Sequence, residues 1–581
     1  MRQGHLWLLG LACCLAPAFM TAQGNVDRAD RGDRGGLDPT DILKPLGESW
    51  PTYSGDYSGK RYSSLTQLNQ STVKNLTLAW AARLTAGPSA GGGGAFGGFG
   101  GRGGAGGAAV IVGGEGSGEL GAGGGTNIKG AILAVNGILY VTTPDNAWAV
   151  DAHDGREIWH YFWKTKGGTH IGNRGVGMWH NYLFMETPDN YLVSLDARTG
   201  KERWHKVISS FSQQYFSTMA PIVVGSHVLV GTGNDLDAPG FLQSFDPETG
   251  ELQWKLYTVP MNEGDPGLET WKNLDAARHG GAQVWVPGSY DPDTHLYITG
   301  TGNPTPAYTS QVRGEGDNLF TCSLIAVNVD TGKMQWYYQT SPHDTHDWDS
   351  AQTPVLADAP FNGRIRKMVL TASRNGYYFT LDRLTGEHLV TGKISETVNW
   401  AKDINQKGQP VRDPRKDHDI AGALVSSSNG GAVNWPPPTF SPDTGLFYAP
   451  VSESWAMYYL SETDPRGAMG LGGKEEVGLG GESFLTAVDY KTGKIAWRHA
   501  YPSIGGGFGG AGLLSTAGKV LFAADAGGNI VARDVSSGKP LWHSHVGAIS
   551  NAPETFMLEG RQYLLVAAGD TMYAFALYNV T

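Results

Sequence analysis

The sequence predicts an all-β protein: an eight-bladed β-propeller built from blade repeats that each end on a docked tryptophan. The first observation behind this prediction is a recurring pattern of a short apolar pair, an Asp, a few polar residues, a Gly and then a Trp. Neighbouring copies end about 45 to 50 residues apart, for example at Trp159, Trp204 and Trp254. The second is the composition, because 84 of the 581 residues are Gly and only 17% are charged. Soluble domains usually have about 7% Gly and roughly 25% charged residues, so we expect many turns and few charged helices.

Each copy of the pattern reads as a strand, a hairpin turn at Thr-Gly or Asp-Gly, and a second strand that ends in Trp. The copies span 149–159, 194–204, 244–254, 326–336, 487–497 and 532–542, with a variant over 380–390 that ends in Val. The gap between residues 390 and 497 has room for a further degenerate copy near 439–448. With the six copies, the variant and a first blade marked by Trp80, eight is the best blade number. We expect the closing blade to join strands from both ends of the chain. The repeated Trp is most simply a packing residue between blades.

The N-terminal region is predicted to be an export signal followed by a flexible leader. Residues 1–24 have a basic start, an apolar run and small residues near the end, as in a secretory signal peptide. Residues 25–48 are polar with interleaved charges, which predicts flexibility. The propeller would then cover 49–581, interrupted by a glycine-dominated segment over 87–127 that we expect to be disordered.

Charge and cysteine content exclude some classes of function. The formal net charge is −11, and an acidic surface argues against nucleic-acid binding, which requires basic stripes. Cleavage near residue 22 would leave Cys322 as the remaining thiol, so we expect no internal disulfide. The sequence contains no Cys-x-x-Cys-His, the motif that attaches c-type haem. We expect a protein that is periplasmic or secreted after signal cleavage.

The stretch 285–349 has the character of a metal or catalytic site. It contains Asn303 in Gly-Thr-Gly-Asn-Pro, followed by Asp347 and Asp349 in His-Asp-Thr-His-Asp-Trp-Asp. Amide and carboxylate oxygens suit a calcium-like cation rather than zinc or copper. On an extended segment the two carboxylates would point to the same side and repel unless a cation or a shared proton relieves them. The alternative is that they are solvated loop carboxylates, which such residues usually are.

The repeat and this stretch together resemble the pyrroloquinoline quinone (PQQ)-dependent alcohol dehydrogenases, the methanol dehydrogenase-like quinoproteins. The resemblance runs from about Trp50 to Ala576 and includes the N-terminal signature Trp-Pro-Thr-Tyr-Ser-Gly-Asp over 50–56. It implies oxidation of a small alcohol with PQQ and either Ca²⁺ or a lanthanide ion. It also implies an external periplasmic electron acceptor of the cytochrome c type.

The resemblance assigns roles to individual residues. The implied metal ligands are Asp235, Asn303, Asp347 and Asp349, of which the last is the extra carboxylate of the lanthanide-using branch. Asp347 would be the general base, and Arg374 would lie beside the quinone oxygens as the second catalytic residue. The implied PQQ-binding residues are Arg174, Thr218, Thr232, Trp285, Arg374 and Asn434. Each also has a structural interpretation: the aspartates and Asn303 as turn residues, the arginines as partners of buried acids, and Trp285 as one more wedge between blades.

The sequence also departs from the family pattern. Gly168-Thr169 stands where the family has a vicinal disulfide, a usual Trp is replaced within 508–512, and His346 stands where Trp is common. Losing these groups reduces the contact area for a flat cofactor. A catalytically empty propeller that binds or scaffolds a partner is therefore the alternative function. A propeller that uses the metal site for another ligand is a third. His343 and His346 are interpreted as loop histidines rather than zinc ligands.

Overall fold

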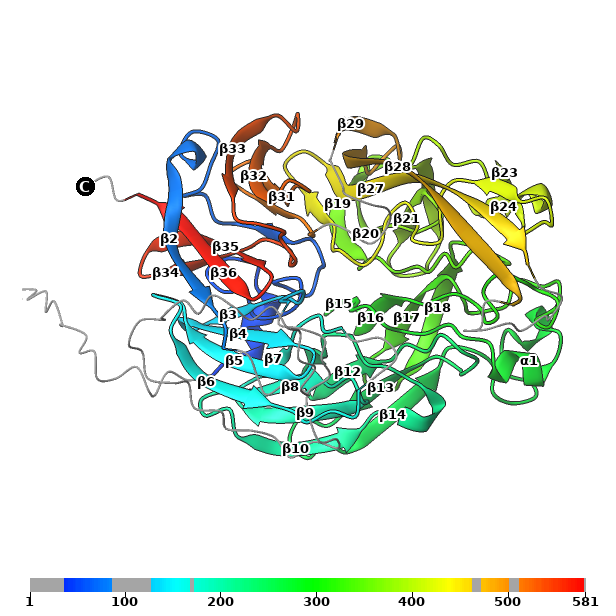
Figure 1. Cartoon of the computed structure of the whole chain (residues 1–581), viewed down its shortest axis with the longest axis horizontal. Coiled ribbons are helices and arrows are strands. Elements are labelled where there is room, and N and C mark those ends of the chain that lie inside the picture. Colours follow the sequence, from blue (N-terminus) through cyan, green and yellow to red (C-terminus); the bar gives the residue numbers. More distant parts are fainter. Residues whose placement is uncertain (1–35, 86–126, 168–171, 462–471, 501–510, 579–581) are drawn as a thin grey trace, which may run out of the picture. The chain divides into compact units, whose positions relative to one another are not determined.

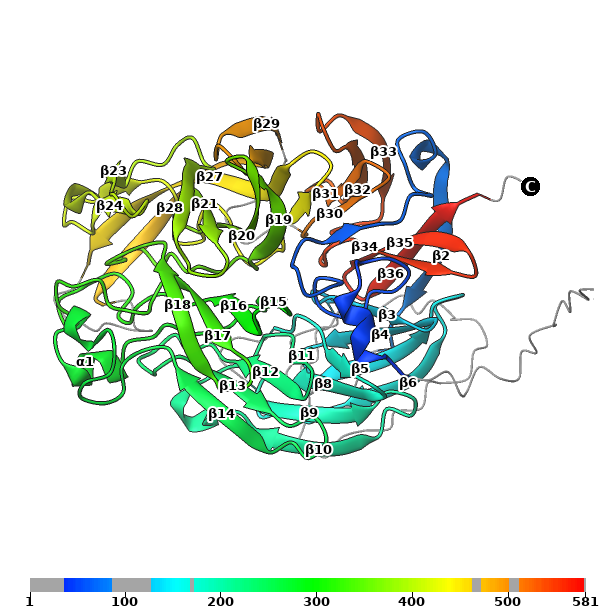
Figure 2. The same cartoon turned by 180° about the vertical axis from the view of Figure 1, so that it is seen from behind.

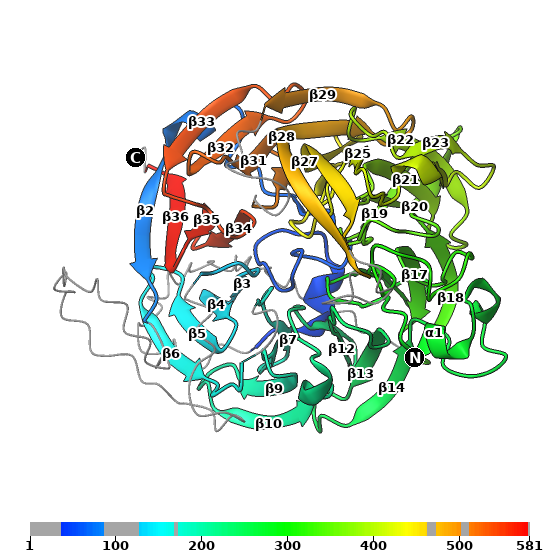
Figure 3. The ribbon, with the colours of Figure 1, turned by 45° about the vertical axis from the view of Figure 1, so that its right-hand side comes forward.

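The computed structural model describes residues 36–85, 127–167, 172–461, 472–500 and 511–578. Residues 36–581 form one compact unit. Within it, antiparallel sheets follow one another in chain order around a common centre (Figures 1 and 3). The predicted signal peptide over 1–24 and nearly all of the glycine-rich insertion over 87–127 lie outside the described residues. The prediction of an all-β, propeller-like fold is confirmed.

The sheets are made of consecutive strands. The first five are β3–β6 (Leu133–Val135, Ile138–Thr143, Asn146–Asp151, Glu157–Phe162), β7–β10 (Gly177–Trp179, Tyr182–Glu186, Tyr191–Asp196, Glu202–Val207), β11–β14 (Ile222–Val224, His227–Gly231, Phe241–Phe245, Leu252–Tyr257), β15–β18 (Ser289–Asp291, Leu296–Gly300, Ser323–Asn328, Lys333–Gln339) and β19–β22 (Val355–Phe361, Arg364–Ala372, Tyr377–Asp382, His388–Lys393). A two-stranded sheet follows, β23 (Ala401–Ile404) with β24 (Pro410–Arg412).

The remaining sheets are larger or combine distant segments. The sixth large sheet holds β25–β29 (Ala423–Val425, Thr439–Ser441, Leu446–Leu460, Lys474–Asp489, Ile495–Ala500), and the seventh holds β1 (Tyr62–Ser63) with β30–β33 (Leu514–Thr516, Val520–Ala524, Asn529–Asp534, Pro540–His545). The last holds β34–β36 (Glu554–Leu558, Arg561–Ala568, Thr571–Leu577) with β2 (Leu76–Arg83). Strand β2 lies beside β36 in both views (Figures 1 and 2), so strands from the two ends of the described chain share one sheet.

Helices are few in the described residues. They are the 3-10 turns η2–η6 (Pro39–Leu43, Val73–Asn75, Phe211–Gln213, Leu268–Thr270, Pro414–Lys416) and α1 (Leu274–Arg278). The long segment between β14 and β15 carries η5 and α1, and α1 lies at the periphery of the view in Figure 1.

The repeated tryptophans contact the turn of the following sheet. The indole nitrogen of Trp336, at the end of one sheet, donates to the carbonyl oxygen of Arg383 in the next at 3.1 Å. Trp159 and Trp254 make the same bond to Ala197 at 3.0 Å and Val329 at 2.7 Å. A Cβ built on Gly386, the glycine of the turn beneath Trp336, would lie 2.6 Å from the ring. A side chain larger than hydrogen is therefore excluded where the indole packs, which explains the pairing of Gly and Trp in the repeat.

The N-terminal segment corrects the prediction of a flexible leader over its second half. Residues 36–48 are packed: Leu37, Ile42 and Leu46 are buried, and the amide of Leu37 donates to the carbonyl of His180 at 3.0 Å. The segment is polar on average, but these few apolar side chains bury enough area to hold it against the propeller.

The segment continues as a strap that touches successive sheets. Trp50 pairs with Ala134 of β3, and the Tyr57 hydroxyl donates to Val223 of β11 at 2.6 Å. Farther on, three main-chain carbonyls of the strap accept hydrogen bonds from three more strands. Tyr57 accepts from Tyr290 of β15 at 2.9 Å, and Ser58 accepts from Leu356 of β19 at 2.7 Å. Lys60 accepts from Phe440 of β26 at 3.0 Å. Strand β1 then pairs with β30. In the described ranges no helix is long and apolar enough to cross a membrane.

Candidate active site

The loop between β18 and β19 places two carboxylates together. The carboxylate of Asp344 accepts hydrogen bonds from the amides of Asp347 at 3.0 Å and Trp348 at 3.2 Å, which closes the loop locally. Asp347 has a φ of 67°, a left-handed conformation that non-glycine residues adopt at a cost. The segment is therefore not extended, and alternation along a strand does not explain why Asp347 and Asp349 lie together. The bend of the loop and a positively charged side chain that both carboxylates share explain it.

That shared cation is the guanidinium of Arg374, from the loop after β20. Its two terminal nitrogens lie 3.5 Å from Oδ2 of Asp347 and 3.4 Å from Oδ2 of Asp349, and one of them also donates to the carbonyl of Asp347 at 2.9 Å. The side chains of Arg374 and Asp349 are 8% and 6% exposed. Burial raises the pKa of Asp347 well above its usual range, and Arg374 only partly offsets it. One guanidinium thus faces two carboxyl groups, of which Asp347 is half-buried and Asp349 buried, and burial opposes the ionisation of both.

Asp349 also connects the carboxylate pair to the indole of Trp285 and to Asn303. Its Oδ2 accepts from the indole nitrogen of Trp285 at 2.8 Å, and its Oδ1 accepts from the Asn303 amide at 2.5 Å. Burial raises the pKa of Asp349, although Arg374 and these donors act in the opposite direction. The close approach of Gly302, where an added Cβ would lie 3.3 Å from Oδ1 of Asp349, explains the glycine before Asn303.

Asp235 lies on the loop after β12. Its side chain is exposed, yet its charge adds to the raised pKa of both Asp347 and Asp349. Among the residues that the structure describes, no three His, Cys, Asp or Glu side chains gather closely enough to hold a metal ion. The predicted metal ligands therefore come together as Asn303, Asp347 and Asp349, with Asp235 as an exposed neighbour.

A second positive group, the guanidinium of Arg174, lies against the Trp285 indole. The guanidinium carbon of Arg174 lies 4.7 Å from the ring centre of Trp285 and 5.0 Å from that of Trp435, and Arg374 lies 5.5 Å from Trp285. Arg174 donates to both oxygens of Thr218, at 2.5 Å to the hydroxyl and 3.0 Å to the carbonyl. Two arginines and two indoles therefore surround one location, as cation–π contacts favour.

Thr232 and Asn434 are the remaining residues predicted to bind the cofactor. Thr232 is fully buried and follows β12. The side-chain amide of Asn434 is used within its own loop, where it donates to Gly430 and accepts from Trp435, both at 2.8 Å. That loop rests on Arg374, whose carbonyl accepts from the Ala432 amide at 2.8 Å. Asn434 thus shapes the loop that presents Trp435 to Arg174.

Comparison with known proteins identifies the family. A family model described as the β-propeller domain of glucose, ethanol and alcohol dehydrogenases matches residues 50–414, and one described as outer membrane protein assembly factor BamB matches 479–580. The chain is 31% identical to the quinohemoprotein alcohol dehydrogenase ADH IIB of Pseudomonas putida, over 96% of this chain and 77% of that protein. The chain belongs to the PQQ-dependent alcohol dehydrogenase family. The quinohemoprotein alcohol dehydrogenase of Comamonas testosteroni is 32% identical, over 90% and 72% of the two chains.

Solved structures of PQQ-dependent alcohol dehydrogenases share the fold. The crystal structure of the Comamonas testosteroni enzyme superposes with a TM-score of 0.79 at 28% identity, and covers 94% of this chain and 83% of that one. A europium-containing methanol dehydrogenase superposes with a TM-score of 0.78 at 25% identity, over 93% and 99% of the two chains. The resemblance to this family drawn from the residues alone is therefore confirmed.

The site contains buried polar atoms that make no hydrogen bond to the described residues. The Nε atoms of Arg174 and Arg374 and the hydroxyl of Thr232 are buried, and within the described residues none has a hydrogen-bond partner. Leaving a buried donor unsatisfied costs about 1–3 kcal/mol. A planar group with carboxylate and quinone oxygens supplies acceptors for such donors between flat aromatic faces. The donor set therefore fits PQQ, and the all-oxygen side chains of Asp347, Asp349 and Asn303 fit a hard cation.

The departures from the family pattern have different outcomes. Gly168-Thr169 and residues 508–510 lie outside the described residues. His346 is buried and stacks on Trp348 with ring centres 4.3 Å apart, while its Nε2 donates to the carbonyl of Lys416 at 2.8 Å. It therefore takes a structural place in the loop. His343 contacts the carbonyl of Gly316 at 2.8 Å through Nδ1.

Several residues of the site carried no usable signal in the sequence. Glu186, at the end of β8, is fully buried, its pKa is raised well above the usual range by burial, and it senses the charge of Arg174. Trp435 follows Asn434 in its motif, but the motif does not predict its contact with Arg174, because Arg174 belongs to a distant loop. Asp344, in the same loop as Asp347, is buried, and burial raises its pKa to about 7.

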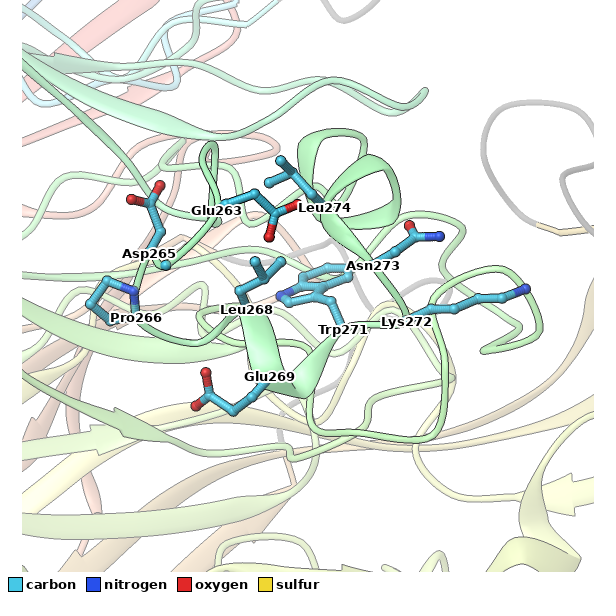
Figure 4. A pocket seen from close by; sticks show the side chains of 10 residues that line it. Glu263, Asp265, Pro266, Leu268, Glu269, Trp271, Lys272, Asn273 and Leu274 are labelled. Atoms are coloured by element: carbon cyan, nitrogen blue, oxygen red, sulfur yellow. The ribbon is translucent and has the colours of Figure 1, made fainter.

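A pocket of about 570 Å³ lies elsewhere, around Trp271 in the segment between β14 and β15 (Figure 4). Figure 4 shows the indole of Trp271 flanked by Leu268, with Glu263 and Glu269 at the margins. It is lined by none of the residues predicted to bind PQQ or metal.

Proposed function

We propose that this protein is an exported quinoprotein dehydrogenase that oxidises small alcohols, with Asp347 as the general base. The observation that carries the proposal is the pair of half-buried Asp347 and buried Asp349, held by Arg374 beside Trp285 in a member of this family. PQQ and a cation, when bound, supply the hydride acceptor and a Lewis acid that polarises its carbonyl.

Asp347 takes the proton of the alcohol hydroxyl. A base must be ionised at working pH, and burial together with Asp349 works against ionisation of Asp347. The pKa of Asp347 falls when a cation lies next to it, because an opposite charge favours the carboxylate. The base is therefore competent only in the metal-loaded protein.

The other residues of the site position Asp347, bind the cation and border the quinone. Arg374 aligns Asp347 through its carbonyl and carboxylate and places fixed positive charge where negative charge develops. Asn303 and Asp349 supply oxygens to the cation, with Asp235 as the third carboxylate. Asp349 adds a negative charge, which favours a trivalent lanthanide ion over Ca²⁺. Arg174, Thr218, Thr232, Trp285 and Asn434 border the quinone.

The scaffold and the cellular setting belong to the same proposal. The eight sheets of four or five strands in the described residues are taken as eight blades, docked on one another through a Trp of the last strand except where that strand carries Val390 instead. Residues 1–24 direct export to the periplasm. Electrons pass to an external cytochrome c-type acceptor, as the name of a relative, the 1-butanol dehydrogenase (cytochrome c) of Thauera butanivorans, indicates for that protein.

Reconstitution tests the proposal. The purified protein is incubated with PQQ and either CaCl₂ or LaCl₃, and the reduction of an artificial electron acceptor is followed with ethanol and longer alkanols. We expect alcohol-dependent reduction that requires PQQ and one of the ions, with the higher activity in La³⁺. Absence of both activity and a change in PQQ absorbance with either ion would support the catalytically empty scaffold instead.

A further inference from the structure

A wall of aromatic side chains stands beside Asp347. It consists of Tyr308, His346, Trp348, His418 and Tyr458, and we call it the aromatic wall. Tyr308 and His418 stack with ring centres 4.6 Å apart and an interplanar angle of 29°. Tyr458 of β27 meets His418 edge-on at 4.7 Å and His346 at 5.0 Å. These rings come from four separate segments, so the tertiary structure builds the wall.

The charge of Asp347 acts on two tyrosines of the wall, Tyr308 and Tyr458. Burial raises the pKa of Tyr308, and the charge of Asp347 raises it further. The pKa of Tyr458 is raised well above its usual range by burial, and Asp347 again contributes. His346 and Trp348 are the chain neighbours of Asp347. The wall therefore borders the place where the alcohol must lie to give its proton to Asp347.

Most polar atoms of the wall are already engaged. The hydroxyl of Tyr308 accepts from the side-chain amide of Asn429 at 3.1 Å, and that of Tyr458 donates to the carbonyl of Ser427 at 3.5 Å. The Nε2 of His346 donates to Lys416, and the Trp348 indole donates to the carbonyl of Ser428 at 3.0 Å.

His418 is the exception. The residue is 8% exposed, and in the described part of the chain neither of its ring nitrogens has a hydrogen-bond partner. Burial lowers its pKa to about 2, with smaller effects from the neighbouring His346 and Lys474, so the ring is neutral at physiological pH. A neutral imidazole has one N–H donor and one acceptor nitrogen. Leaving both unsatisfied costs about 1–3 kcal/mol for each atom.

We propose that His418 is a specificity-determining residue that hydrogen-bonds a second hydroxyl of the substrate, so that diols are preferred to simple alkanols. A hydroxyl group donates one hydrogen bond and accepts others, which complements a neutral imidazole. Tyr308 stacks on the imidazole and fixes its plane, so the ring is oriented before the substrate arrives. The proposal rests on the proposed alcohol oxidation and names its substrate class.

Matched pairs of substrates test the role of His418. Each α,ω-diol from three to six carbons is compared with the alkanol in which a methyl replaces the second hydroxyl, as 1,4-butanediol with 1-pentanol. For the PQQ- and metal-loaded wild-type protein we expect at least one diol to have a kcat/KM about tenfold or more above its alkanol, since a site built for a hydroxyl rejects the analogue that lacks it. Wild-type protein without a diol preference at any length overturns the proposal.

Variants assign the preference to the imidazole. His418→Phe keeps a stacking ring and removes both nitrogens, so kcat/KM for the preferred diol should fall about tenfold while that for the alkanol stays within about twofold. His418→Gln retains a donor and an acceptor and should restore part of the preference. His499→Phe is the matched control, because His499 lies on the outer strand β29 and contacts the carbonyl of Ser537 in the turn before β33. This variant should leave the ratio unchanged.

The outcomes separate the two proposals. Equal losses for diol and alkanol in His418→Phe, with the PQQ absorbance of the loaded protein retained, would show a structural role and overturn the inference. Wild-type protein that oxidises alkanols and diols alike would remove only the inference about His418. Wild-type protein that oxidises no alcohol would remove the proposed function.

Discussion

Aspartate serves two opposite purposes in the repeat turns and in the central cluster. In the turn after β13, Oδ1 of Asp246 accepts from the amides of Glu248 at 2.9 Å and Thr249 at 2.8 Å. Partial burial opposes ionisation there, but these donors outweigh it and the pKa of Asp246 is lowered. Burial raises the pKa of Asp347, and the single guanidinium of Arg374 does not reverse that effect.

The difference shows that the hydrogen-bond donors around a carboxylate decide whether its ionised form stabilises or destabilises the folded state. The donors of Asp246 are amides two and three residues ahead, so the local sequence provides them whenever the turn forms. Asp347 and Asp349 receive few donors for their charge, and they depend on groups from other loops. A carboxylate in this second situation is costly for the fold and useful for proton transfer.

The largest expected effect comes from Asp347→Asn. Loss of the general base should lower kcat for alcohol oxidation by about 10³-fold, within the range of about 10²–10⁴ that general base catalysis contributes. The melting temperature should stay near that of the wild-type protein, because the uncharged amide relieves repulsion. Dye-linked activity of the loaded protein is the measurement.

Asp246→Asn is the control for that experiment and should retain activity. If Asp347→Asn stays within a few-fold of wild type, the base is another group and the contrast between the two regions is lost.

A medium effect is expected where the repeat turns meet the tryptophans. Gly386→Ala should lower the free energy of unfolding by about 3 kcal/mol, since it combines the left-handed strain of φ 73° with a clash 2.6 Å from Trp336. Gly363→Ala has similar strain at φ 80° but no atom within 4 Å, so it should cost only about 1–2 kcal/mol.

Urea unfolding of the two glycine variants measures the difference, which isolates the contribution of tryptophan packing. Equal losses would mean that the indole contact adds nothing to the turn. The alcohol dehydrogenase activity of folded protein should change little in either variant.

The smallest effect concerns pH and has opposite signs in the two regions. The raised pKa of Asp349 means that ionisation destabilises the folded apoprotein as pH rises above the ordinary Asp range. Asp349→Asn removes this loss, so its melting temperature relative to wild type should be higher at pH 8 than at pH 4.

Asp246→Asn should do the reverse. Its lowered pKa stabilises the folded state above the ordinary Asp pKa, and that stability is lost as pH falls. The variant should be less stable than wild type by about 1 kcal/mol at pH 7, and the difference should shrink toward pH 3. Differential scanning fluorimetry of metal-free protein from pH 3 to 8 measures both trends, and the same sign for both variants would refute the comparison.

The candidate site was predictable where residue type and motif agreed. Trp285, Asn303, Asp347, Asp349 and Arg374 were named from the sequence, and the structure brings them into contact. The reason for the contact was not predictable, because the left-handed φ of Asp347 and the bonds from Asp344 belong to one folded loop. The exposure of Asp235 was also missed, since a motif does not reveal how a loop packs.

By itself the sequence determined the repeat: strands of period two, Asp-x-x-x-Gly turns and a terminal Trp, all set by interactions within a few residues. Only the tertiary structure decided the strap over 36–63 and the meeting of Tyr308, His418 and Tyr458 beside Asp347. Those contacts join segments that are far apart in the chain, and their energy comes from buried area and desolvated charge. Neither quantity exists until the sheets have packed.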